Sequence, residues 1–171
     1  MPRKIVHVGR KIQVALETQE LPNGEIVRRD VVLHPGAVAI LPMIDDRHVC
    51  LLRNERPILG ETLWEIPAGT LEPDEPPLEA AKRELAEETG YRAAQWQQLT
   101  VLIPSPGVLS ERIYLFQAED LTPGEMQLEA CENIEPQTVE VSQAMQWVRE
   151  GIIQDAKTII ALFWWQSSLL E

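Results

Sequence analysis

The sequence predicts an α+β fold, because segments with strand character fill the first two-thirds of its 171 residues and helical segments collect near the end. One helical segment, at residues 77–89, interrupts the run of strands. Hydrophobic residues make up 44% of the chain, which is enough for a packed core, and the length suits one domain better than two. This order of elements differs from the regular alternation of strands and helices in α/β proteins.

The N-terminal segment has the pattern of an antiparallel β-hairpin. Residues 11–21 alternate between apolar and polar side chains, which is typical of a half-buried strand. Residues 22–24 are Pro-Asn-Gly, and Asn-Gly tolerates the positive φ that tight turns require. Residues 26–33 then form the returning strand. We therefore expect an N-terminal β-hairpin region at 1–33 and the main domain at 34–171.

Further strands and helices follow along the chain. Residues 37–41 and 48–53 are expected to pair as strands around the polar turn at 45–47, and a short strand follows at 61–66. After the helix at 77–89, the remaining expected elements are strands at 97–103 and 112–118, a helix capped by Ser142 and ending at Gly151, and a last helix that begins near Asp155.

The helix at residues 77–89 carries the clearest local signals. A proline suits its first turn, and Leu78, Ala81 and Leu85 form an apolar stripe along one side. Gly90 stands where the C-terminal cap of a helix belongs. Both ends of this helix are therefore predicted from the sequence.

Charge and composition exclude several classes of protein. The net charge is −12, and a chain this acidic repels a phosphate backbone, so binding to nucleic acid is disfavoured. The longest apolar run, residues 159–165, is far shorter than a membrane span, and the N-terminus lacks the apolar stretch of a signal peptide. Two cysteines far apart support neither a disulfide framework nor a cysteine-based zinc site. We expect a cytoplasmic protein with no nucleic-acid or membrane partner.

Three glutamates share one sector of the predicted helix. Glu84 and Glu88 are one turn apart, and Glu87 is offset from Glu84 by about 60° around the axis. Neighbouring like charges destabilise a helix by about 0.2–0.5 kcal/mol per exposed i,i+4 pair, and a divalent cation would remove that repulsion. A solvated helix face, with Arg83 paired to Glu87, is the alternative interpretation of these residues taken alone.

The wider segment at residues 69–91 matches the pattern Gly-x5-Glu-x7-Arg-Glu-U-x-Glu-Glu-x-Gly-U, in which U is a bulky aliphatic residue. The segment thereby resembles the signature of the Nudix hydrolases. The specified positions are occupied by Gly69, Glu75, Arg83, Glu84, Leu85, Glu87, Glu88 and Gly90. Tyr91 departs from the pattern at a packing position. The resemblance implies an α/β/α sandwich with a mixed sheet and hydrolysis of a nucleoside diphosphate linked to another moiety.

The resemblance also implies which residues hold a metal. Glu84 and Glu88 correspond to metal ligands of the family, often joined by Glu87. The backbone carbonyl of Ala68 corresponds to a further ligand, and Arg83 is similar to an arginine that orients a signature glutamate. Mg²⁺ or Mn²⁺ is the implied cofactor.

Other segments resemble the ADP-ribose pyrophosphatases within this family. Residues 63–69 (Leu-Trp-Glu-Ile-Pro-Ala-Gly) look like their strand that enters the signature. Residues 53–57 (Arg-Asn-Glu-Arg-Pro) resemble their Arg-Gln-x-Arg segment, with Asn54 in place of the usual glutamine. Residues 105–107 are the Ser-Pro-Gly of that subfamily, and Glu111 stands at the matching place beyond it. The N-terminal region resembles the sheet that these dimers exchange, which implies a homodimer.

These segments supply the candidate substrate-binding residues. Arg56 can hold a diphosphate oxygen through its planar guanidinium. Each of these residues has an alternative interpretation. Arg56 is otherwise one more exposed arginine. Arg28 and Arg29 either reach a nucleotide across a dimer interface or decorate an edge strand, and Trp64 either stacks on adenine or packs in the core. The full set is Arg28, Arg29, Arg56, Trp64, Glu65 and Glu111.

A carboxylate outside the metal site is expected to activate the attacking water, because metal binding lowers the basicity of the signature glutamates. Residues 129–135 hold three acids and resemble the mobile loop from which ADP-ribose pyrophosphatases supply a catalytic glutamate. Glu132 is the first candidate, Glu135 the second, and Glu87 the candidate within the signature. A solvated acidic loop is the alternative interpretation of this segment.

The sequence thus predicts metal-dependent hydrolysis of the diphosphate bond of ADP-ribose, or of a related nucleoside diphosphate sugar, to AMP and ribose 5-phosphate. A GDP-mannose-type pyrophosphatase is one alternative, because those enzymes share the Ser-Pro-Gly segment and a similar last helix, here residues 155–160. A sensor that binds ADP-ribose without turnover is another. Such sensors generally carry a DNA-binding domain, for which this chain leaves no room and has no basic patch.

Overall fold

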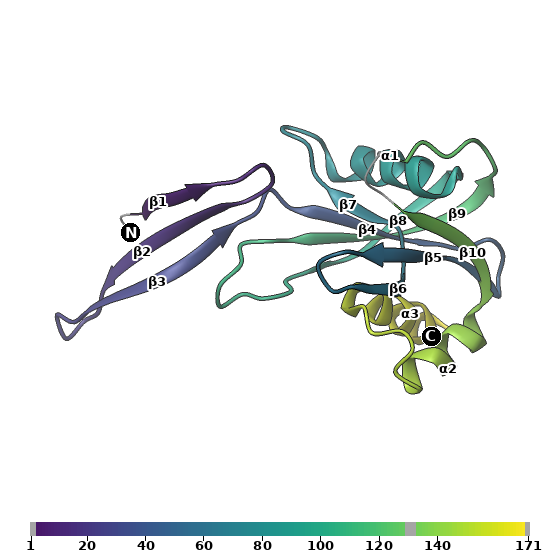
Figure 1. Ribbon diagram of the computed structural model, residues 1–171. Coiled ribbons are helices and arrows are strands. Elements are labelled where there is room, and N and C mark those ends of the chain that lie inside the picture. Colours follow the sequence, from purple (N-terminus) through teal and green to yellow (C-terminus); the bar gives the residue numbers. More distant parts are fainter. Residues whose placement is uncertain (1–2, 129–132, 170–171) are drawn as a thin grey trace.

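The computed structural model describes residues 3–128 and 133–169, which form three β-sheets and three helices (Figure 1). In chain order the elements are β1 (Arg3–Val8), β2 (Gln13–Glu20), β3 (Ile26–Leu33), β4 (Ala37–Pro42), β5 (His48–Arg56), β6 (Glu61–Glu65), β7 (Ala68–Thr70), α1 (Pro77–Thr89), β8 (Arg92–Leu102), β9 (Ile113–Thr122), β10 (Ile134–Glu140), α2 (Val141–Arg149) and α3 (Ala156–Ser168).

The first three strands form an antiparallel sheet of order β1-β2-β3, here called the N-terminal arm (residues 3–33). In Figure 1 the arm extends from one side of the molecule, away from the other two sheets. The expected hairpin is confirmed as β2 and β3, with Gly24 at a φ of 82° in the turn between them. The sequence did not indicate β1, because every residue of this strand is exposed and no buried face imposes an alternating pattern.

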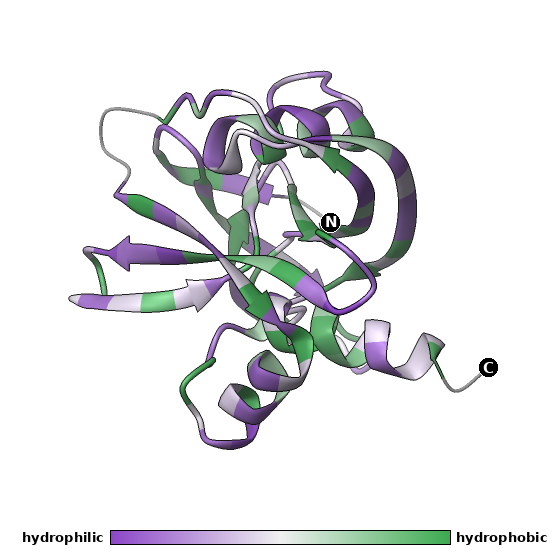
Figure 2. Cartoon of the chain, turned by 90° about the vertical axis from the view of Figure 1, so that its right-hand side faces the viewer, coloured by the Kyte–Doolittle hydropathy of each residue, from purple (hydrophilic) through white to green (hydrophobic). Residues whose placement is uncertain are grey.

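A four-stranded sheet of order β7-β4-β9-β8 lies at the centre of the molecule. The sheet is mixed, because β4 and β9 run parallel whereas its other neighbours run antiparallel. Val38 and Ile40 pack with Leu85 of α1, and the alternate residues Ala39 and Leu41 pack on the opposite side with residues of α2 and α3. Figure 2 shows hydrophobic and hydrophilic bands alternating along the curved strands. The expected α/β/α arrangement with a mixed sheet is confirmed.

The third sheet, of order β10-β5-β6, corrects one expected strand pairing. The segments predicted to form a hairpin around residues 45–47 are β4 and β5. They lie in different sheets, with an isolated bridge between Met43 and Val49 at the turn. The physical reason is that β7 and β9 occupy both edges of β4. The Asp45 carboxylate accepts hydrogen bonds from the backbone N–H groups of Arg47 and His48, 2.8 Å each, and thereby turns the chain toward β5.

The helices match the expected positions, with one correction. Helix α1 ends at Gly90, whose φ of 75° is the left-handed conformation of a glycine cap. Helix α2 follows Glu140 and has no side-chain cap, so Ser142 lies inside the helix instead of capping it. Asp155 caps α3 by accepting a hydrogen bond from Thr158 N. Within the described residues, no helix is long and apolar enough to cross a membrane.

Candidate active site

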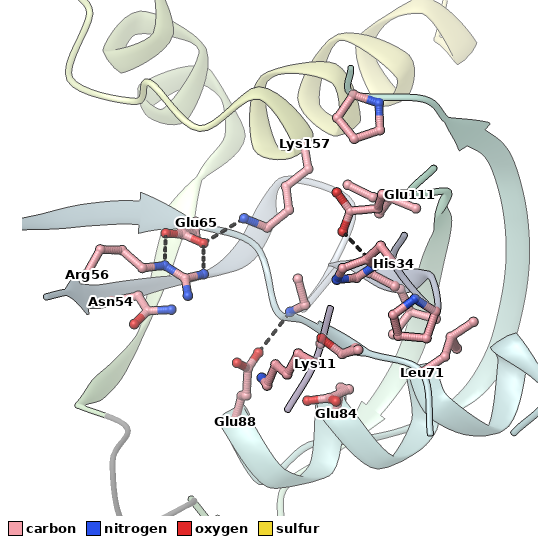
Figure 3. Close-up of a pocket in the computed structure, with 18 of the residues that line it drawn as sticks. Lys11, His34, Asn54, Arg56, Glu65, Leu71, Glu84, Glu88, Glu111 and Lys157 are labelled. Atoms are coloured by element: carbon pink, nitrogen blue, oxygen red, sulfur yellow. Dashed lines mark hydrogen bonds and ion pairs between the residues drawn. The ribbon is translucent and has the colours of Figure 1, made fainter. Parts of the chain in front are cut away.

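A cavity of about 1510 Å³ opens where several elements meet. Its wall comprises the turn between β1 and β2, the loop from β3 to β4, the hairpin of β5 and β6, the start of α3 and one face of α1. Residues 68–73 and residues 104, 111, 113 and 134 complete the wall, so segments from distant parts of the chain line one space. Figure 3 shows side chains of both charges directed toward it.

The buried carboxylates of α1 form one wall of this cavity. Glu84 is 8% exposed and Glu88 is 3% exposed, and their spacing of four residues places them on one face of the helix. A Cβ atom on Gly69 would overlap the Glu84 carboxylate, so a larger residue at this position would force that carboxylate to move. Glu88 Oε2 accepts a hydrogen bond of 2.9 Å from the backbone N–H of Ala68. The signature thus holds strand and helix together at the cavity.

Arg83 connects three carboxylates of the signature, one of which is Glu84. Its Nε and Nη2 donate to the two oxygens of Glu75 over 2.9 and 3.0 Å, and its Nη1 donates to Glu84 over 2.7 Å and to Glu87 over 3.0 Å. The hydrogen bonds to Glu75 raise the pKa of Arg83, and the same bonds lower the pKa of Glu75. Arg83 therefore orients Glu84 and Glu87, and Glu75 holds Arg83 in place.

The chemistry of these side chains fits a hard divalent cation. Carboxylate oxygens are the preferred ligands of such ions, and two buried glutamates on one helix face require positive charge nearby. Within the described ranges, no three His, Cys, Asp or Glu side chains are already gathered in the arrangement of a metal site. Arg83 supplies the compensating charge at Glu84 in this structure. The carboxylate oxygens of α1 are therefore suitable ligands for a divalent cation, and the set of residues that binds it stays a prediction.

Glu65 lies at the centre of a second group of charges, on the opposite side of the cavity. This side chain is 2% exposed and accepts two hydrogen bonds from Arg56, of 2.7 and 2.6 Å, and one of 2.6 Å from Lys157 Nζ (Figure 3). Burial raises the pKa of Glu65, but the hydrogen bonds and charges of Arg56 and Lys157 outweigh it, and the net shift is downward. Glu65 is therefore an anchor for two cations that face the cavity.

The start of α3 fixes this second group to the strand that leads into the signature. Lys157 Nζ also donates to Asp155 over 2.8 Å. The Thr158 hydroxyl donates to the Asp155 carboxylate and accepts a hydrogen bond of 2.8 Å from the backbone N–H of Ile66. Helix α3 thus positions Lys157 relative to Glu65, because the Thr158 hydroxyl is hydrogen-bonded to the backbone of Ile66, the residue next to Glu65.

The loops that close one end of the cavity contribute a histidine and a glutamate. His34 Nδ1 lies 3.4 Å from Glu111 Oε1 and accepts a hydrogen bond of 3.1 Å from the Gly36 N–H. The Ser110 hydroxyl accepts a hydrogen bond of 2.9 Å from the His34 backbone N–H. Glu111, a candidate substrate-binding residue, thus lines the cavity.

Several of the predicted site residues lie elsewhere. Arg28 and Arg29 are exposed on β3 of the N-terminal arm, outside the cavity lining of their own chain. Glu135 is exposed on β10, bonded to Gln137 Nε2, and also outside the lining. Glu132 falls outside the described residues.

Trp64 faces the side of β6 that is turned away from the cavity. Its ring centroid lies 4.8 Å from that of Trp147 on α2 and 5.8 Å from the Arg53 guanidinium. Because side chains alternate along a strand, the neighbouring Leu63 and Glu65 point to the cavity instead. Of the two interpretations of Trp64, this position corresponds to packing against other side chains, not to stacking on a nucleotide base.

Of the cavity's five cationic side chains, sequence reasoning missed three, namely Arg10, Lys11 and Lys157. Arg10 and Lys11 lie on the turn between β1 and β2, and among the described residues neither has an ion-pair partner, whereas Arg56, Arg83 and Lys157 all have one. No local motif marks these positions. Only the folded arrangement brings them to the cavity.

The comparisons with known proteins agree with this geometry. A family model described as the NUDIX domain matches residues 33–163. An ADP-ribose pyrophosphatase of Bacillus subtilis is 39% identical over 156 residues, covering 90% of this chain and 84% of that protein. A methanol dehydrogenase activator of Bacillus methanolicus is 36% identical with the same coverage of both chains.

A solved structure gives the same assignment. The crystal structure of an ADP compounds hydrolase superimposes with a TM-score of 0.84 and 26% sequence identity, over 99% of this chain and 92% of that one. The family match covers well over half of the chain and includes the α1 carboxylates and the segment of Arg56. The chain therefore belongs to the Nudix family and is a Nudix hydrolase.

Proposed function

We propose that this Nudix hydrolase cleaves the diphosphate bond of ADP-ribose, giving AMP and ribose 5-phosphate, with Mg²⁺ or Mn²⁺ as cofactor. One observation carries the proposal: a single cavity places the buried carboxylates of α1 opposite the cations that surround Glu65. An anionic diphosphate and a hard cation can occupy such a site together. The similarity to an ADP-ribose pyrophosphatase over 90% of the chain supports the choice of substrate.

The cation is held by Glu84 and Glu88, with Glu87 and the backbone carbonyl of Ala68 as further ligands. A bound divalent ion polarises the diphosphate and lowers the pKa of a water molecule. Arg83 keeps the Glu84 and Glu87 carboxylates oriented toward this side of the cavity.

Substrate recognition is assigned to the opposite wall. Arg56 binds a diphosphate oxygen, and its guanidinium is already oriented by two hydrogen bonds to Glu65. Lys11 and Arg10 attract the anion to the cavity mouth, because these cations have no ion-pair partner among the described residues. Glu111 accepts hydrogen bonds from sugar hydroxyl groups.

The proton of the attacking water is accepted by a carboxylate outside the metal ligands. Glu132 is the first candidate and Glu135 the second. If neither loop glutamate acts, Glu87 is the remaining candidate and takes this role in place of metal binding; it lines the cavity, and its Oε2 accepts a hydrogen bond from Arg83.

We also propose that residues 1–33 form a dimerisation region and residues 34–171 the hydrolase domain. Residues 1–33 hold six bases and four acids, a balance of +2, whereas residues 34–171 hold nine bases and 23 acids, a balance of −14. The arm also exposes aliphatic side chains, namely Ile5, Val6, Val8, Ile12 and Ile26. A second copy would cover these side chains and complement the charge. Arg28 and Arg29 then reach the nucleotide in the partner's cavity.

The dimer is tested by sedimentation. We expect a dimer at nanomolar concentration, and a variant lacking residues 1–33 that neither dimerises nor binds substrate well. A stable monomer with full activity contradicts the assembly and leaves the hydrolase assignment intact.

A substrate panel tests the reaction. The wild-type enzyme is assayed with Mg²⁺ on ADP-ribose, ADP-glucose, GDP-mannose, NADH and diadenosine polyphosphates, and AMP release is measured. We expect the highest kcat/KM for ADP-ribose and loss of activity with a chelator. A preference for GDP-mannose would favour the alternative drawn from the Ser-Pro-Gly segment. Tight binding of ADP-ribose without turnover would make the protein a sensor.

A further inference from the structure

Asn54 differs from the other buried polar side chains of the described residues because its carboxamide has no hydrogen-bond partner among them. The described residues include six such side chains, and hydrogen bonds or ion pairs engage five of them: Glu65, Glu84, Glu88, Thr89 and Thr158. The Asn54 carboxamide is 6% exposed and bonds to no other group within residues 3–128 and 133–169. Its polar atoms are not sealed in the protein, since no fully enclosed side-chain nitrogen or oxygen of the described residues lacks a partner. They therefore open into the cavity that Asn54 lines.

The surroundings of Asn54 would suit an apolar residue. Asn54 lies on the central strand β5, where its register partners are Leu63 on β6 and Ile134 on β10. Both partners line the same cavity. An apolar side chain of the same size would pack between these partners as well, and the Asn54 amide makes no hydrogen bond to the described residues that would account for a polar residue there. A polar residue at this position points to a polar occupant of the cavity.

The neighbours of Asn54 indicate the charge of that occupant. Arg56 lies two residues further along β5, on the same face and roughly 6.8 Å away along the strand. Figure 3 shows Asn54 and Arg56 projecting from β5 on the side that faces Glu84 and Glu88 of α1. The Arg56 guanidinium and the NH2 group of the Asn54 amide both donate hydrogen bonds, so a group with several acceptor oxygens, such as a diphosphate, can meet them together.

We propose that the Asn54 carboxamide donates a hydrogen bond to a phosphate oxygen of the substrate, beside the oxygen held by Arg56. This rests on the proposed function, in which a nucleoside diphosphate occupies the cavity. Asn54 is thus a substrate-binding residue that contributes a neutral donor where the wall is already crowded with charges.

Three variants and one control test this assignment. Asn54→Leu has a similar size and no hydrogen-bonding group, Asn54→Gln keeps the amide, and Asn54→Asp places a carboxylate against the anion. Gln117→Leu is the matched control, because Gln117 is a half-buried carboxamide on β9 outside the cavity lining. KM and kcat are measured with ADP-ribose and Mg²⁺, Kd is measured by calorimetry with α,β-methylene-ADP-ribose, and Tm is measured without ligand.

We expect Asn54→Leu to raise KM and Kd by about tenfold, equal to about 1.4 kcal/mol, with kcat within about threefold of wild type. Its Tm should not fall, because a polar group without a partner has been replaced by an apolar one. Asn54→Gln should restore the affinity to within about threefold, and Asn54→Asp should weaken binding more than Asn54→Leu. Gln117→Leu should leave KM unchanged.

Wild-type affinity in Asn54→Leu overturns the inference. So does a fall in Tm in both Asn54→Leu and Asn54→Gln, since that outcome makes Asn54 a structural residue. If the wild-type enzyme prefers another nucleoside diphosphate of the panel, the proposed substrate is wrong. The same variants assayed on that compound then decide the role of Asn54, because the diphosphate is common to all these substrates.

Discussion

Lys157 Nζ lies 2.6 Å from Oε2 of Glu65, although 92 positions separate the two residues in the sequence. Glu65 is 2% exposed and Lys157 also faces Asp155, so the contact fastens the start of α3 to β6. Arg56 binds the same carboxylate from the other side. One buried anion therefore determines the position of two cations of the cavity.

Replacing Lys157 by methionine should destabilise the protein. The change leaves Glu65 with Arg56 as its remaining cation, and a buried charge that loses a partner costs about 1–3 kcal/mol. Urea unfolding at pH 7 measures the loss. Lys82→Met is the control, because Lys82 pairs with Glu79 at the exposed surface, where such pairs contribute about 0–1 kcal/mol. Equal effects of the two substitutions would contradict the assigned role of Lys157.

The charges around Glu65 also predict how the free energy of unfolding depends on pH. The folded state holds the pKa of Glu65 below its ordinary value of 4.5, because Arg56 and Lys157 outweigh the effect of burial. A lowered pKa adds stability above pH 4.5, and that contribution is lost as the pH falls through the folded-state pKa. In Lys157→Met the pKa of Glu65 is lowered less, so the free energy of unfolding should fall less between pH 4.5 and pH 3 than in the wild type. Unfolding curves between pH 7 and pH 3 would reveal it, and identical profiles for the two proteins would refute it.

Gly69→Ala should damage both fold and activity. The added Cβ would overlap the Glu84 carboxylate, so either β7 or the Glu84 side chain must move. Such overpacking typically costs about 1–3 kcal/mol. Gly107→Ala is a stability control, because a Cβ there meets no atom within 4 Å. A Gly69→Ala protein with wild-type Tm and activity would show that the close approach of β7 to α1 is not required.

Local signals in the sequence were sufficient for the signature helix. Helical periodicity places Glu84 and Glu88 on one face whatever the rest of the chain does, and Gly90 ends the helix as expected. The N-terminal hairpin was similarly predictable from alternation and from the turn at Gly24. In each case the determining residues lie within a few positions of one another.

The rest of the cavity depends on contacts between distant segments. Lys11 and Lys157 reach it from opposite ends of the chain, and neither carries a local motif. Pro136 lies within β10, because a strand at the edge of a sheet tolerates a proline, and its place there depends on pairing with β5. The face to which Trp64 points also follows from strand register, which one sequence does not determine.

Glu88→Gln should lower kcat by at least about a hundredfold while the fold persists. Glutamine retains an acceptor oxygen for the Ala68 N–H but removes the charge that a metal ligand supplies, and each 1.4 kcal/mol of lost stabilisation is about tenfold in rate. Glu79→Gln, on the exposed side of the same helix, should leave kcat unchanged. A fully active, magnesium-dependent Glu88→Gln enzyme would refute the ligand assignment.

Glu132→Gln should reduce kcat strongly and leave KM nearly unchanged, because a general base acts mainly in the transition state. Glu135 is the second candidate, but β10 places it opposite Arg53 at an exposed position and outside the cavity lining. Glu135→Gln should therefore affect the rate less than Glu132→Gln. Both variants are assayed for AMP release under saturating ADP-ribose. Wild-type kcat in Glu132→Gln with a large loss in Glu135→Gln would transfer the role to Glu135, and no loss in either would return it to Glu87 on α1.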